Sequence, residues 1–195
     1  MRYFNKVTFG MEFRAVRSIK AGEELFTYYT DPVIHTSSRQ EDLKPYGFQC
    51  GCESCRTPSD SDFVRMQLYR NTPMLVDYKR LVVFLMTPGL PESYVVDHSL
   101  QQLELIERTG LEGSEFYSSH LKFLVEAYCA VENLQKALIY LRKLEDFKRA
   151  ESGGEEKSVK TLMQMVKEHP RWGWKTKIQG AMEVAGFYAH CSSVL

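Results

Sequence analysis

The sequence lacks three features that would each point to a large class of proteins. It has no run of 18 or more apolar residues, which excludes a predicted membrane-spanning helix, because such a helix needs about 20 of them. It has no excess charge: 25 Lys and Arg residues balance 25 Asp and Glu residues, whereas a dedicated nucleic-acid binder is normally basic. The N-terminus has no apolar segment of the signal-peptide type. We therefore expect neither a membrane nor direct nucleic acid among its partners.

Cysteine is scarce and unevenly placed, with three of the five cysteines, Cys50, Cys52 and Cys55, inside six residues. Thiols this close together are poor disulfide partners, but C-x-C and C-x-x-C spacings suit tetrahedral zinc. The alternative is three unrelated buried cysteines. Zinc takes four ligands, and Cys129 and Cys191 could supply the fourth only in principle, so we expect an open or partly occupied structural site. Free thiols also fit a reducing compartment, which makes a nuclear or cytoplasmic location the expectation.

The first thirty residues are predicted to form a small β-meander. Apolar residues alternate with polar ones from Val7 to Ala15, which is typical of a strand with one buried face. A turn at Lys20–Glu23 leads to a second predicted strand at Leu25–Tyr29, which is aromatic and favours β structure. Because so small a sheet is not stable alone, something must cover it.

Beyond a turn-rich stretch at 57–62, the apolar periodicity becomes helical. We predict helices starting near Tyr78 and Ser99, two more within 115–149, one over 159–166 and a weak one over about 175–188. The pair within 115–149 resembles a tetratricopeptide-type hairpin, but a plain helical bundle explains the same pattern equally well. The predicted class is α+β, with a first part at 1–58 and an α-helical part at 59–195.

One long, ordered motif resembles the C-terminal end of a SET domain with its post-SET cysteines, as found in SMYD-like and fungal SET proteins. It covers roughly residues 7–58. Its residues are Ala21-Gly22-Glu23-Glu24-Leu25, Tyr29, Asp31, Arg39, Leu43, Tyr46-Gly47-Phe48, Cys50, Cys52 and Cys55.

The resemblance implies a protein-lysine methyltransferase that uses S-adenosylmethionine, with a histone or another lysine-bearing protein as substrate. It implies that Tyr29 is catalytic, that Tyr46 lines the substrate lysine channel and that Phe48 packs on the cofactor adenine. It also implies zinc on Cys50, Cys52 and Cys55. Without the resemblance, Tyr29 is an ordinary strand aromatic, while Tyr46 and Phe48 anchor the cysteine segment.

The sequence departs from the resembled family in three places. It has no Gly-x-Gly segment, no Asn-His-Ser-Cys segment, which would supply the fourth zinc ligand, and no MYND zinc finger. We therefore expect a truncated chain that lacks the cofactor-binding half and is inactive alone. The alternative is a non-enzymatic helical interaction module with a small zinc-binding element.

Overall fold

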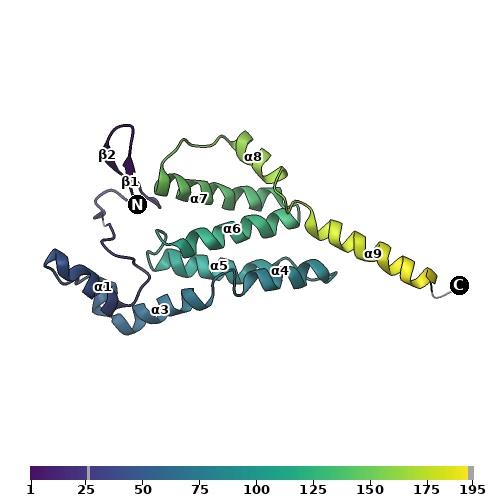
Figure 1. The fold of residues 1–195 in the computed structure, drawn as a ribbon, viewed down its shortest axis with the longest axis horizontal. Coiled ribbons are helices and arrows are strands. Elements are labelled where there is room, and N and C mark those ends of the chain that lie inside the picture. Colours follow the sequence, from purple (N-terminus) through teal and green to yellow (C-terminus); the bar gives the residue numbers. More distant parts are fainter. Residues whose placement is uncertain (26, 193–195) are drawn as a thin grey trace.

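The computed structural model describes residues 1–25 and 27–192. A short β-hairpin is followed by an irregular connector (residues 14–35) and a layer of helices (Figure 1). The cysteine-bearing loop (residues 47–52) lies between η1 and α2. The elements are β1 (Arg2–Asn5), β2 (Gly10–Phe13), α1 (Thr36–Leu43), the 3-10 helix η1 (Lys44–Tyr46), α2 (Glu53–Arg56), α3 (Pro58–Arg70), α4 (Asp77–Met86), α5 (Ser93–Arg108), α6 (Glu115–Ala130), α7 (Leu134–Ser152), α8 (Val159–Lys167) and α9 (Trp174–Ser192). No helix in the described ranges is long and apolar enough to cross a membrane.

The sheet differs from the predicted meander. β1 pairs antiparallel with β2, with Arg2 opposite Phe13 and Asn5 opposite Gly10. The predicted strand from Val7 therefore begins only at Gly10, because residues 6–9 form the hairpin turn. The predicted strand at Leu25–Tyr29 is wrong, since none of its described residues is in a strand. Aromatic residues favour a strand only where a neighbouring strand and a half-buried face are available. Within the described residues, no strand lies beside this segment to pair with it.

The predicted burial of one hairpin face is also wrong. Val7 is 95% exposed and Phe9 is 83% exposed, and Phe4, Met11 and Phe13 are exposed as well. The half-buried face is instead the one that carries Tyr3 and Glu12, because it is turned toward the helices. There Arg14 donates to the Arg149 carbonyl at 2.9 Å, which fastens the hairpin to the end of α7. Period-2 alternation located the strand but assigned the wrong face to the interior.

The helical region forms around α6, which lies between α5 and α7 (Figure 1). Leu121, Phe123, Leu124 and Tyr128 of α6 are almost completely buried, so this helix supplies the centre of the core. The two helices predicted within 115–149 are confirmed as α6 and α7, joined by a three-residue connection. A single hairpin of this kind occurs in repeats and in bundles, and the tetratricopeptide likeness stays a prediction.

Helix α3 is absent from the predicted elements. Its start has ordinary helix signals, Pro58 in the first turn and Asp60 nearby, within a stretch that is otherwise typical of a turn. Its buried positions are Arg65 and Leu68, and a buried arginine does not register in an apolar pattern. The partition at residue 58 coincides with the start of α3 and stays a prediction.

Candidate functional site

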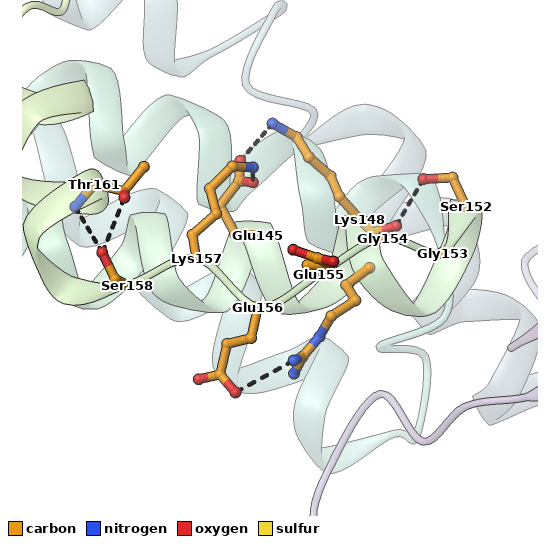
Figure 2. Close-up of a pocket in the computed structure, with 11 residues that line it drawn as sticks. Glu145, Lys148, Ser152, Gly153, Gly154, Glu155, Glu156, Lys157, Ser158 and Thr161 are labelled. Atoms are coloured by element: carbon orange, nitrogen blue, oxygen red, sulfur yellow. Dashed lines mark hydrogen bonds and ion pairs between the residues drawn. The ribbon is translucent and has the colours of Figure 1, made fainter.

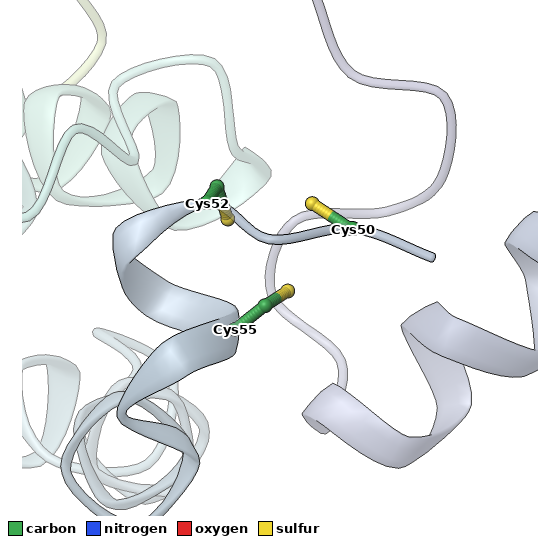
Figure 3. A group of neighbouring side chains, drawn as sticks. All are labelled: Cys50, Cys52 and Cys55. Atoms are coloured by element: carbon green, nitrogen blue, oxygen red, sulfur yellow. The ribbon is translucent and has the colours of Figure 1, made fainter. Parts of the chain in front are cut away.

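The three clustered cysteines converge on one point in space. Cys50 lies in the loop before α2, Cys52 immediately precedes α2 and Cys55 lies within it. Their sulfur atoms all lie within 4.8 Å of one another, and Figure 3 shows them pointing toward a common centre. Tetrahedral zinc–thiolate bonds of about 2.3 Å place sulfur atoms about 3.8 Å apart. The thiols therefore fit a zinc ion after a small contraction.

The surroundings of the cluster affect its thiols differently. Burial acts to raise the pKa of Cys52, but hydrogen bonds from the backbone of Cys55 and from the neighbouring thiols lower it below its usual value. Burial raises the pKa of Cys55, although the Arg39 side chain opposes this. Cys52 is thus easier than Cys55 to convert to the thiolate, which is the form that binds a metal.

A fourth sulfur ligand does not join the cluster within the described residues. Cys129 lies fully buried on α6, with its sulfur 3.9 Å from the Val166 carbonyl, and burial raises its pKa to about 12. It is a core residue. The side chain of Cys191, the other predicted candidate, lies outside the residues whose side chains the structure describes.

Helix α1 and helix α3 frame the cysteine loop through a buried polar network. The guanidinium of Arg39 donates to the Thr36 hydroxyl at 2.8 Å and lies 3.8 Å from both the Cys55 sulfur and an Asp62 oxygen. Asp62 in turn accepts from the backbone and the hydroxyl of Thr36, both at 2.9 Å. Arg65 donates to the Pro32 carbonyl at 2.6 Å. These contacts tie the connector, α1 and α3 together around the thiols.

The three aromatic residues predicted from the resemblance come together next to this loop. The ring of Tyr29 lies 5.4 Å from that of Tyr46 and 5.9 Å from that of Phe48, both edge to face. Between the latter two stands Gly47, whose φ of 73° is a left-handed conformation that glycine adopts at little cost. This turn lets both flanking rings reach Tyr29. All three rings are about half exposed, so they form an open aromatic surface.

Tyr28 points away from this surface, toward the helices. Its hydroxyl donates to the Gly110 carbonyl at 2.6 Å, and its ring packs so closely on Gly113 that a Cβ there would lie 2.9 Å from it. Burial raises its pKa. The Tyr28-Tyr29 pair thus anchors the connector on the α5–α6 loop with one ring and presents the other ring to Tyr46 and Phe48.

Parts of this chain are similar to known proteins. Over 145 residues the chain is 29% identical to N-lysine methyltransferase SMYD2 of Homo sapiens, covering 68% of this chain and 33% of that protein. It is 49% identical over 47 residues to N-lysine methyltransferase SMYD2-B of Xenopus laevis, covering 24% of this chain and 11% of that protein. The chain is related to the SMYD-like SET-domain proteins. It spans about a third of the length of the SMYD2 relatives that it matches.

The predicted SET resemblance is thereby confirmed. Its fungal side has only weak support, from a match to histone-lysine N-methyltransferase SET5 of Scheffersomyces stipitis that is 44% identical over 50 residues and covers 25% of this chain and 10% of that protein. No family model matches the chain, and no solved structure matches it.

A surface groove of this SET-related chain lies elsewhere, between the end of α7 and the start of α8, with a volume of about 690 Å³ (Figure 2). Its charged groups neutralise one another: Lys148 and Lys157 both contact Glu145, and Arg149 contacts Glu156. It contains none of the predicted site residues. We therefore assign it no part in the candidate site.

A second polar cluster, which sequence reasoning missed, is buried in the helical region. Asp77, at the start of α4, accepts from His98 and from the Ser99 hydroxyl, each at 2.8 Å. The Ser99 hydroxyl also lies 2.9 Å from Nδ1 of His120, whose Nε2 is buried without a partner among the described residues. Apart from the adjacent His98 and Ser99, the members that contact one another are 21 or 22 residues apart in sequence, so no local spacing reveals the cluster.

Proposed function

We propose that this chain contributes the catalytic tyrosine and the metal-stabilised segment of a SET-type, S-adenosylmethionine-dependent protein-lysine methyltransferase. The observation that supports it best is the convergence of Tyr29, Tyr46 and Phe48 beside three clustered thiols. The names of the relatives support the same reaction, because they are N-lysine and histone-lysine methyltransferases. The substrate would be a lysine-bearing protein, a histone or another.

The chemistry asks little of the protein beyond alignment. S-adenosylmethionine, when bound, supplies the methyl group, and the amine of the substrate lysine must face that group in line and without its proton. Tyr29 would orient the amine with its hydroxyl, and Tyr46 would bound the apolar stem of the lysine. Phe48 would offer its ring to the adenine, since aromatic faces pack well on one another. A zinc ion on the three cysteines would hold the segment that carries two of these rings.

Replacing Tyr29 with phenylalanine is expected to lower methyl transfer roughly 10²-fold, the cost typical of removing one positioned hydrogen-bonding group. The measurement is transfer of a labelled methyl group to histones and other proteins by the protein tagged at its own locus and purified from its native source. Tyr94→Phe is the matched control, because it removes the same hydroxyl from an exposed ring on α5, and it should transfer at the wild-type rate. If Tyr29→Phe transfers methyl groups at the wild-type rate, Tyr29 is not a catalytic residue. No transfer by the wild type would favour the non-enzymatic interaction module.

The 195-residue chain alone is expected not to bind S-adenosylmethionine with micromolar affinity. The reason is that the sequence has neither the Gly-x-Gly nor the Asn-His-Ser-Cys segment that the resemblance associates with the cofactor pocket. Isothermal calorimetry on the purified chain measures this directly. A dissociation constant in the micromolar range would show that other residues hold the cofactor.

Replacing Cys52 with serine is expected to weaken zinc binding by roughly 10²-fold or more, because changes to groups that merely support ligands already cost 10- to 100-fold. Zinc affinity is measured by competition with a chromogenic chelator. Cys129→Ser provides the control, since this thiol lies in the core and should leave zinc affinity unchanged. If both variants bind zinc like the wild type, the metal proposal is wrong.

A further inference from the structure

The carboxamide of Gln40 forms a two-point clamp on the backbone of Cys50. Its Nε2 donates to the Cys50 carbonyl at 2.9 Å, and its Oε1 accepts from the Cys50 amide at 3.0 Å. Only one orientation of the amide satisfies both bonds, because the reversed orientation would place two donors and two acceptors face to face. Gln40 therefore fixes both the distance and the direction of this backbone segment relative to α1.

This clamp matters because the three thiols are held by different elements. Cys52 and Cys55 are related to each other through α2, in which the Cys52 carbonyl accepts from the amides of Cys55 at 2.9 Å and Arg56 at 3.0 Å. Cys50 lies outside any helix or strand. The Gln40 clamp is what ties its backbone to α1. The same helix reaches the other side of the cluster through Arg39, which lies 3.8 Å from the Cys55 sulfur.

We propose that Gln40 is a positioning residue for the metal cluster, which sets the Cys50 thiol against those of Cys52 and Cys55. The inference rests on the proposed metal site and goes beyond it, because it names a non-ligand on which metal affinity depends. A ligand that must be ordered at the moment of binding loses affinity, whereas one held in advance does not. Both hydrogen bonds of the Gln40 carboxamide hold the Cys50 backbone in place before a metal binds.

The test is a Co²⁺ titration of the full chain, followed by zinc competition. Absorption by thiolate–cobalt charge transfer reports the sulfur ligands, and the competition gives the affinity. Gln40→Ala is expected to weaken metal binding about 10- to 100-fold, as the loss of groups that orient ligands does. Gln40→Glu should weaken it at least as much, because a carboxylate oxygen would replace the donor that faces the Cys50 carbonyl. The thermal unfolding midpoint of the metal-free chain should stay unchanged, because Gln40 is not part of the hydrophobic core, most of which lies in helices α4 to α8.

Gln49→Ala is the matched control, since it removes the same side chain from the exposed neighbour of Cys50 and should bind metal like the wild type. If the wild type gives no thiolate–cobalt band, the metal site itself fails, and this inference fails with it. If the wild type binds cobalt and Gln40→Ala binds within twofold of it, the metal site stands and the role of Gln40 is wrong. A large drop in the metal-free unfolding midpoint of Gln40→Ala would also overturn it, because Gln40 would then be a general stabilising residue.

Discussion

Replacing Asp77 with alanine is expected to lower the free energy of unfolding by about 2–5 kcal/mol, because a buried donor left without its acceptor costs about 1–3 kcal/mol and Asp77 serves two of them. Asp77 is fully buried and accepts hydrogen bonds from His98 and Ser99, each at 2.8 Å. Its loss leaves these two donors unpaired in the interior and also removes a carboxylate from the first turn of α4, where it interacts favourably with the helix dipole. Urea unfolding followed by far-ultraviolet circular dichroism gives the value.

The control is Asp97→Ala, which removes the same side chain from an exposed position on α5. Surface changes of this kind stay within about 0.5 kcal/mol. If Asp77→Ala costs less than about 1 kcal/mol, the polar cluster does not hold α4, α5 and α6 together, and the other contacts between these helices do.

Acidification is expected to destabilise the chain through His120, before most carboxylates are protonated. Burial lowers the pKa of His120 from 6.5 to about 4, although Asp77 on α4 opposes this and His98 on α5 adds to it. Between pH 6.5 and 4 the unfolded chain therefore binds a proton on this imidazole that the folded chain does not. Stability is complete above pH 6.5 and falls as the pH is lowered, by about 2 kcal/mol between pH 6.5 and 5.

The measurement is the free energy of unfolding at pH 7, 6.5, 6, 5.5 and 5 for the wild type and for His120→Gln. Glutamine keeps a hydrogen-bonding group near Ser99 but does not titrate, so most of the slope should disappear. His35→Gln, which removes an exposed imidazole from the connector, should retain the wild-type slope. An unchanged slope in His120→Gln would assign the acid sensitivity to other groups.

The cysteine cluster and much of the helical region could be predicted from sequence because both depend on residues that are close along the chain. Three thiols within six residues cannot lie far apart, and the structure places their sulfur atoms within 4.8 Å of one another. In the same way, apolar residues at helical spacing predicted α4, α6, α7 and α8, since each of these helices buries apolar residues of that pattern. Helix α3 was not predicted, because one of its two buried residues is Arg65, and a charged residue does not contribute to an apolar pattern.

The hairpin shows where local pattern fails. Alternation from Val7 to Ala15 indicates two different faces, but which face is buried depends on what the hairpin packs against. Here the apolar face is exposed, and the face with Tyr3 and Glu12 is turned toward α7. The same limit applies to Leu25–Tyr29, where strand propensity has no partner strand to act on within the described residues.

The sequence by itself determined the SET relationship, the cysteine cluster and the identity of the candidate residues Tyr29, Tyr46 and Phe48, because motif residues are read in order along the chain. Only the tertiary structure decided that these three rings meet, since a glycine in a left-handed turn and the docking of Tyr28 on Gly110 bring two segments together. It also decided the clamp of Gln40 on Cys50 and the buried cluster around Asp77. Polar side chains are satisfied by whichever group the fold brings within about 3 Å, and sequence order does not encode that distance.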